Sequence, residues 1–174
     1  MLPKRLTTAL GLRGVFTAKD TNSLISACNK LEIKIENNEQ FEGEFNRYFV
    51  GPQAPIAPPY ASFYLDGGGA IMGKTTQTVR ELYDLMGLIN PKEGSLPEDF
   101  LGLELDAYYQ LLHIELTKNI HYLQSLRLHF LKEHIAMWIP LFIQAAKNSD
   151  HTPSPSLLAL LDSLNAFINT ELSN

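Results

Sequence analysis

The segment FLGLELDAYYQLLHIEL, residues 100–116, decides the fold because it is apolar around most of its circumference at helical spacing. One apolar stripe consists of Leu101, Leu105, Tyr108, Leu112 and Leu116, and the other of Phe100, Leu103, Ala107, Leu111 and Ile114. A helix with two apolar stripes can remove both from water only by packing between other helices. We therefore expect this helix to lie at the centre of a helical bundle.

Three residues that suit the first turn of a helix stand beside this segment. Pro97 is favoured at the first helical position, and Glu98 and Asp99 suit the positive end of the helix dipole. Adjacent acids are also compatible with acid–base chemistry, but at a helix N-terminus they are more often dipole partners. We therefore expect residues 97–99 to open the central helix.

Two helical segments are expected toward the C-terminus. The first contains Pro140, which should kink it because proline has no N–H to donate. Its apolar residues are Leu131, Ile135, Trp138, Phe142 and Ala145. After a proline-containing loop at 149–156, the last helix is indicated by Leu157, Leu160, Leu161, Leu164, Phe167 and Ile168.

An amphipathic helix is expected ahead of the central one. Its apolar residues, at i, i+3, i+4 and i+7, are Val79, Leu82, Tyr83 and Met86. We expect Thr75 or Thr76 to cap its start, and Gly87 and Asn90-Pro91 to end it.

The N-terminal part predicts shorter helices. Residues 4–35 indicate one or two helices interrupted near 17–22. Residues 42–49 indicate another, whose aromatic face comprises Phe45, Tyr48 and Phe49.

A loop must follow, because residues 51–59 contain four prolines, and no helix tolerates that density of missing N–H groups. Residues 60–65 form the single strand-like stretch, and residues 67–69 are three glycines that suit a hinge or turn. The sequence therefore predicts an all-α protein, one domain of residues 1–174 built as a bundle of roughly six to eight helices.

The composition favours a cytoplasmic protein that does not bind nucleic acid. The net charge of −5 offers no basic cluster for phosphates, although it would suit a basic peptide partner. Cys28 is the only cysteine, which excludes an internal disulfide and favours a reducing compartment. The N-terminal stretch 6–16 is too interrupted for a signal peptide, and no segment approaches the about 20 apolar residues of a membrane span.

One motif argues for nucleotide chemistry. Residues 68–75, GGAIMGKT, match the P-loop pattern, in which Gly68 and Gly73 would let backbone N–H groups cradle phosphates. Lys74 would reach the terminal phosphates and Thr75 would hold magnesium. A P-loop also needs a preceding buried strand and a surrounding sheet, which the sequence does not indicate. The favoured interpretation is a glycine-rich turn before a helix, so we expect no enzyme activity.

Other chemistry is weakly indicated. His113, His121, His129 and His134 do not show the i, i+3 or i+4 pairing of helical metal sites. We expect them to be amphipathic or capping residues, and we predict neither a metal nor a cofactor. No serine or cysteine stands in an arrangement that indicates a nucleophile.

Five separated motifs occur in a familiar order and spacing. They are Phe45-Asn-Arg-Tyr48-Phe49-Val-Gly51-Pro52, Pro58-Pro59-Tyr60-Ala-Ser62-Phe-Tyr64, Met72-Gly73, Pro97-Glu98-Asp99, and Trp138 with Phe142. Together they resemble the TorD/DmsD/NarJ family of redox-enzyme maturation chaperones. The resemblance extends over about residues 45–142, whereas the region before residue 40 is shorter than is usual in the family.

The resemblance implies an all-helical cytoplasmic chaperone. Such a protein would bind the twin-arginine leader, and often the body, of a molybdenum-cofactor oxidoreductase subunit, and would delay export until the cofactor is inserted. It would be a monomer or a domain-swapped homodimer, and guanine-nucleotide binding has been associated with some members.

The resemblance also implies two binding regions. The first comprises Phe45, Tyr48, Phe49, Gly51, Pro52, Pro59, Tyr60 and Ser62, and the second Pro97, Glu98 and Asp99. The family usually has histidine after that aspartate, where this chain has Phe100. This departure leaves partner choice open.

Physical chemistry supports the same expectation independently. A leader peptide has a basic and an apolar part, so its groove needs apolar walls with acids at one end. The aromatic residues of the first region would form the walls, and Glu98, Asp99 and Asp66 would meet the arginines. The alternative is that the aromatics are ordinary core residues and the prolines merely shape a loop, within a generic helical interaction domain.

Overall fold

The computed structural model describes residues 3–174, and its central element is the helix that the two apolar stripes predict. This helix, α6 (Leu101–Lys118), buries residues on both stripes and packs against α1 (Lys4–Phe16) and α7 (Tyr122–Phe130). Phe100 is the N-cap of α6 rather than part of its stripe, and Leu116 is 39% exposed near the other end. The prediction of a central helix is confirmed.

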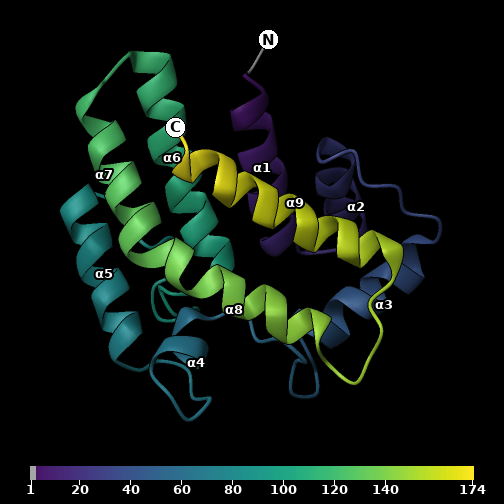
Figure 1. Ribbon diagram of the computed structural model, residues 1–174. Coiled ribbons are helices and arrows are strands. Elements are labelled where there is room, and N and C mark those ends of the chain that lie inside the picture. Colours follow the sequence, from purple (N-terminus) through teal and green to yellow (C-terminus); the bar gives the residue numbers. More distant parts are fainter. Residues whose placement is uncertain (1–2) are drawn as a thin grey trace.

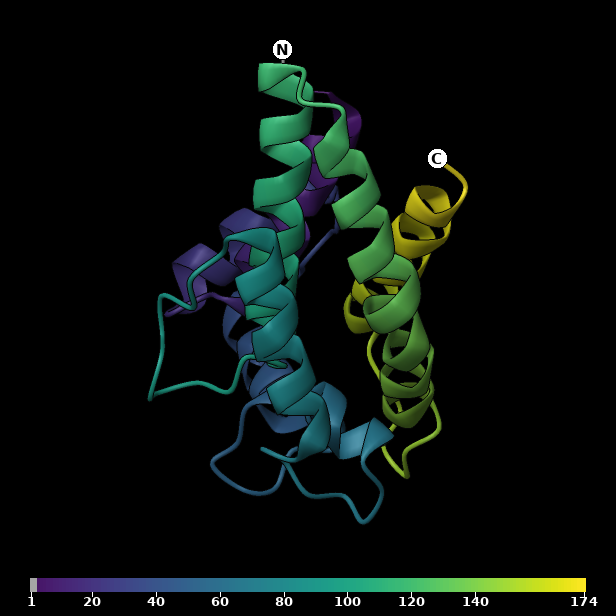
Figure 2. The same ribbon diagram turned by 90° about the vertical axis from the view of Figure 1, so that its left-hand side faces the viewer.

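The remaining helices wrap this centre (Figures 1 and 2). Their bounds are α2 Thr21–Lys30, α3 Asn38–Phe49, α4 Ala61–Leu65, α5 Lys74–Met86, α8 Ala136–Lys147 and α9 Pro155–Leu172. A buried apolar core runs from α1 to α9 and includes Trp138 and Phe142. Met1 and Leu2, where the predicted single domain would begin, lie outside the described residues. The all-α prediction is confirmed.

The helical segment that contains Pro140 bends, as expected, and a π-helical turn lies at the bend. Leu131–Ile135, labelled η1, forms a π-helical turn between α7 and α8, and Pro140 lies inside α8. The two helices run in different directions on either side of this turn (Figure 1). In a regular helix the N–H of residue 140 would donate to the carbonyl of Ala136, but proline has no N–H. Ala136 comes immediately after η1, so the missing hydrogen bond lies next to the bend.

Two local predictions are wrong. The strand-like stretch 60–65 forms the short helix α4, and only Tyr60 makes an isolated bridge, to Phe100. Tyr and Phe favour strands, but no neighbouring strand exists in the described chain to pair with them. Residues 97–99 do not open α6 either, because they form a turn that ends at the N-cap.

The predicted cap of α5 is also wrong. Neither Thr75 nor Thr76 caps the helix; its N-cap is Gly73, which has no side chain to accept the orphan N–H groups. Asp66 takes this role from the preceding loop: its carboxylate accepts from the N–H of Thr75 at 3.0 and 3.1 Å and from the Thr75 hydroxyl. A side chain at position 73 would collide with Asp66, which explains the glycine there.

A buried cluster of charges links four helices. Glu171 on α9 accepts from Arg5 on α1 at 2.7 and 2.8 Å, from Tyr108 on α6 at 2.6 Å, and from Arg127 on α7 at 3.0 Å. Arg127 also binds Glu115 at 2.7 Å. These groups satisfy one another, which is the condition under which buried charges are tolerated.

Candidate functional site

The largest of the hollows on the described surface is lined by aromatic rings from distant parts of the sequence. This aromatic groove has a volume of about 520 Å³. It runs between the C-terminal ends of α1 and α3, the proline loop and the segment before α6. Its lining residues are Arg13, Val15, Phe16, Thr17, Ala18, Lys19, Phe45, Phe49, Val50, Pro55, Tyr60, Pro91, Lys92, Leu96, Phe100, Leu103 and Asp106.

Packed aromatic rings lie along the aromatic groove, and three of them, Phe16, Phe45 and Phe49, are also buried members of the hydrophobic core. Phe49 lies 5.1 Å from Phe45 and 5.7 Å from Phe16, measured between ring centroids. Tyr60 and Phe100 form another pair of lining rings, with their centroids 5.5 Å apart. Four of the predicted residues therefore do line one surface. Val50, at its edge, is 62% exposed, so the apolar lining extends into solvent.

The pair Tyr60 and Phe100 is positioned by a short antiparallel contact. The N–H of Ala61 donates to the carbonyl of Asp99 at 3.1 Å, and the N–H of Leu101 donates to the carbonyl of Pro59 at 2.9 Å. Pro59 is buried and can only accept, which is the role it has here. The two predicted regions are thus joined through their backbones.

Asp99 and Ser62 have a structural role at this junction. The fully buried Asp99 carboxylate accepts from the Ser62 N–H at 2.7 Å and from the Thr76 hydroxyl at 2.7 Å. It therefore ties the start of α4 to α5, and neither oxygen faces the aromatic groove. Pro97 forms the turn that leads into this clamp, since its carbonyl accepts from the Phe100 N–H at 3.1 Å.

Glu98, in the same turn, contacts residues of α5. Its carboxylate accepts two hydrogen bonds from Arg80, each 3.1 Å long, and its carbonyl accepts from the Tyr83 hydroxyl at 2.8 Å. Burial tends to raise the pKa of Glu98, but the hydrogen bonds and charge of Arg80 outweigh it and lower the pKa below 4.5. Glu98 is therefore ionised and paired at neutral pH.

The remaining residues of the first region shape the proline loop. Tyr48 is buried and donates its hydroxyl to the carbonyl of His151, and its own carbonyl accepts from Ala57 at 2.8 Å. Gly51 has a φ of +119°, a conformation that other residues rarely adopt. Pro52 is exposed on the loop and does not line the aromatic groove.

Of the three acids predicted to meet a client's arginines, only Glu98 lines a hollow near the aromatic groove, whereas Asp99 and Asp66 do not. A middle hollow of about 320 Å³ shares Pro91, Leu103 and Asp106 with the groove. It also adjoins a third hollow of about 220 Å³, which we call the acidic hollow. The acidic hollow is lined by Arg80, Tyr83, Asp84, Leu88, Ile89, Asn90, Glu93 and Glu98. The middle hollow thus shares lining residues with each of the other two, and the three lie next to one another around the loop that follows α5.

The P-loop residues do not form a phosphate site. The segment before Gly68 is the helix α4 rather than a strand, and the described chain contains no sheet. At the start of α5, the Asp66 carboxylate occupies the position that a phosphate would take. Lys74 is exposed, and the Thr75 hydroxyl donates to Asp66. Asp66 therefore serves to cap α5 and lines none of the three hollows.

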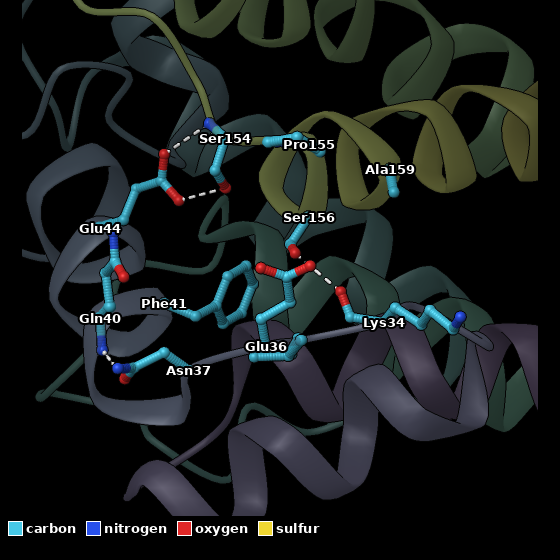
Figure 3. Close-up of a pocket in the computed structure, with 11 residues that line it drawn as sticks. Lys34, Glu36, Asn37, Gln40, Phe41, Glu44, Ser154, Pro155, Ser156 and Ala159 are labelled. Carbon is cyan, nitrogen blue, oxygen red and sulfur yellow. Dashed lines mark hydrogen bonds between the residues drawn. The ribbon is translucent and has the colours of Figure 1, made fainter.

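A further hollow of about 390 Å³ lies between α3 and the start of α9 (Figure 3). Its polar groups are used to attach α9: Glu44 accepts from the N–H and hydroxyl of Ser154 at 2.7 and 2.6 Å, and Ser156 donates to the carbonyl of Lys34. None of the predicted site residues lines it. We therefore assign this hollow to the attachment of α9.

Sequence reasoning missed two residues that line these hollows, and it misassigned one histidine in the core. Phe16 follows no aromatic pattern, although its position just before the predicted break at 17–22 is an indirect indication. Arg80 belongs to the polar face of α5, where nothing local indicates its partner. His134 is not an amphipathic or capping residue: it is buried and bound to Glu104.

The described residues show neither a metal-binding cluster nor a helix suited to a membrane. Among residues 3–174, no group of three or more His, Cys, Asp or Glu side chains is arranged to hold a metal ion. Within the same residues, no helix combines the length and apolar character that crossing a bilayer requires.

Comparison with known proteins gives a consistent result. The family described as nitrate reductase delta subunit matches residues 17–144. The chaperone protein TorD of Vibrio cholerae is 28% identical over 140 residues, which cover 76% of this chain and 62% of that protein. The probable Tat proofreading chaperone DmsD of Haemophilus influenzae is 27% identical over 118 residues, 68% of this chain and 54% of that protein.

The chain thus spans less than two thirds of the length of these curated relatives. A redox enzyme maturation protein from Archaeoglobus fulgidus has a similar solved fold, with a TM-score of 0.59 and 17% identity. That similarity covers 98% of this chain and 94% of the other.

Proposed function

The chain belongs to the nitrate reductase delta subunit family, and from this membership we propose that it is a maturation chaperone for a molybdenum-cofactor oxidoreductase subunit. Its client segment would be the twin-arginine leader, the body of the subunit, or both. The chain would act in the cytoplasm, as one non-catalytic domain, before its client is exported.

The observation that supports this proposal is the set of three adjoining hollows around the loop after α5. One end is the aromatic groove, where the half-buried rings of Tyr60 and Phe100 and the exposed Val50 offer apolar surface to an extended or helical peptide. The other end is the acidic hollow, where Asp84, Glu93 and Glu98 lie. A leader with arginines before an apolar stretch is complementary to both ends at once.

Tyr60 and Phe100 are central to the groove in this proposal. Phe100 replaces the histidine that the family usually has, and its ring lies on Tyr60. The groove therefore gains apolar area where other members have an ionisable ring. We propose that this chain prefers clients whose apolar segment is bulky at the matching position.

The test is calorimetric titration with a synthetic peptide that carries two adjacent arginines followed by an apolar segment. Val50→Asp places a charge at the exposed edge of the groove and should weaken binding about tenfold. Met137→Asp is the matched control, because Met137 is 59% exposed on α8 and lines none of the three hollows. Equal affinities for the two variants would contradict the proposal.

The nucleotide-binding alternative finds no support in the geometry of residues 68–75, because Asp66 occupies the anion position. A generic helical interaction domain is the remaining alternative. It would bind a client body without any requirement for a leader peptide, so failure of every leader to bind folded wild-type protein would favour it.

A further inference from the structure

The ion pair between Arg80 and Glu98 is asymmetric in its exposure. The Glu98 side chain is 6% exposed, whereas the Arg80 side chain is 59% exposed. A carboxylate removed from water needs a cation close to it, but a guanidinium in water needs no protein partner. Glu98 therefore depends on a guanidinium, while Arg80 is free to leave if another cation takes its place.

The surroundings of the pair would receive a second guanidinium. Asp84 and Glu93 line the same acidic hollow, and their charges, with that of Glu98, contribute to raising the pKa of Arg80. An additional arginine that entered the hollow would meet these two carboxylates. The negative charge of the three acids would then compensate two guanidinium groups.

We propose that Arg80 is an internal substitute for a client arginine, and that binding exchanges the two guanidinium groups on Glu98. This inference rests on the proposed function. In the free protein, Arg80 keeps the buried carboxylate paired. In the complex, the client's arginine makes the two parallel hydrogen bonds to Glu98, and Arg80 turns outward toward Asp84 and Glu93.

Exchange of like for like has two consequences. First, the number of charge-assisted hydrogen bonds to Glu98 is conserved, so Arg80 lowers the affinity for the client without preventing binding. Second, a client lysine cannot replace both hydrogen bonds, because an ammonium group lacks the planar fork of guanidinium. The preference for arginine over lysine therefore lies in the Glu98 carboxylate, and Arg80 is the cation that either client group has to displace.

The direction of the client follows from the same geometry. With an arginine on Glu98, the residues after it would pass along the middle hollow, beside Leu88 and Ile89. They would then reach the rings of Phe100 and Phe49 in the aromatic groove. A leader whose arginines precede its apolar segment would thus run from the acidic hollow to the aromatic groove.

The experiment compares Arg80→Gln with Lys118→Gln in calorimetric titrations of two peptides. The peptides share one apolar segment and differ only in an Arg-Arg or Lys-Lys pair. Both substitutions remove one positive charge, and Lys118 is exposed at the C-terminal end of α6. Arg80→Gln should bind both peptides about fivefold tighter than Lys118→Gln does, and Arg-Arg should still be preferred because the preference lies in Glu98.

Glu98→Gln provides the second measurement, because it removes the carboxylate for which both arginines compete. It should reduce the preference of the protein for Arg-Arg over Lys-Lys. If Arg80→Gln unfolds, as judged by circular dichroism, Arg80→Lys replaces it and should still tighten binding of the Arg-Arg peptide.

The outcomes separate the two proposals. If wild-type protein is folded and binds neither peptide, the proposed function fails and the exchange fails with it. If wild-type protein binds the Arg-Arg peptide but neither Arg80 variant binds it more tightly than Lys118→Gln, only the exchange is overturned. A gain for Arg80→Gln that Arg80→Lys does not share would overturn it as well, because Arg80 would then act through net charge alone.

Discussion

Glu104 on α6 and His134 in the π-helical turn form a buried pair, with 2.5 Å between Oε1 and Nε2. The other oxygen of Glu104 accepts from the indole of Trp138 at 2.9 Å. The pair thus attaches the bend between α7 and α8 to the central helix, at a place where no water is available to solvate a charge. Both partners have pKa values that differ from those of exposed residues.

The first prediction concerns this pair and pH. Burial tends to lower the pKa of His134, but the carboxylates of Glu104 and, more weakly, Asp99 outweigh it and raise the pKa above 6.5. Burial also raises the pKa of Glu104 above 4.5. The folded protein therefore holds more protons than the unfolded chain, and the stability from the pair is present below pH 6.5 and decreases as pH rises through the folded pKa of His134.

Urea unfolding of wild-type protein and His134→Gln between about pH 6 and pH 9 checks this. The advantage of the wild type should be largest at the acidic end and decrease toward the alkaline end. His113→Gln, on the central helix α6, is the control for the loss of a histidine side chain. A wild-type advantage that does not depend on pH would contradict the prediction.

The second prediction concerns the buried charge cluster. Arg127→Met removes a guanidinium that is fully buried between Glu115, Glu171 and Tyr108. The carboxylates would remain with less compensation, so the free energy of unfolding should fall by about 3–5 kcal/mol. Lys118→Met, an exposed position, should change it by less than about 0.5 kcal/mol. Denaturant titration measures both, and equal effects would show that the cluster contributes nothing.

A third prediction separates a positioning role for Asp99 from direct contact with a client. Thr76→Val removes one donor to the Asp99 carboxylate and should cost about 1 kcal/mol of stability. Asp99→Ala leaves the Ser62 N–H without its acceptor as well and should cost about 3 kcal/mol.

Both variants should also weaken peptide binding, in the order of their loss of stability, because Tyr60 and Phe100 lose their support. Asp99→Asn that remains fully stable but loses affinity would instead indicate direct contact between Asp99 and the client. Thermal denaturation and calorimetric titration of the same samples give the two quantities.

The fourth prediction concerns the start of α5. Asp66→Ala removes the cap that Thr75 engages and should destabilise the protein by about 1 kcal/mol. Lys74→Ala should leave stability nearly unchanged, because Lys74 is exposed at the first helical position. ATP or GTP with magnesium should not raise the melting temperature of the wild type, and a rise that Lys74→Ala abolished would restore the P-loop interpretation.

The sequence predicted the helices well where burial is periodic. The stripes of α6 and the register of Leu157 to Ile168 on α9 depend only on helical geometry and on the removal of apolar surface from water. The aromatic face of residues 45–49 and the proline loop were also found for local reasons. These features make up most of the fold and the walls of the aromatic groove.

Contacts between distant residues were beyond such reasoning. Asp99 looks like a helix-dipole acid, but its partners are Ser62 and Thr76, 37 and 23 residues away. Asp66 caps α5 from outside its first turn. The role of Arg80 is evident only from its hydrogen bonds to Glu98. Spacing along the chain does not encode which polar groups meet, so the polar half of the candidate site required the structure.

The buried cluster around Glu171 has a consequence for biosynthesis. Arg5 and Glu171 are separated by 166 residues, so the first and last helices can be joined only after almost all of the sequence has been translated. At about 5–20 residues per second, Arg127 would wait several seconds for its carboxylate partner on α9. A ribosome-bound chain that stops before α9 should therefore be cleaved readily by protease.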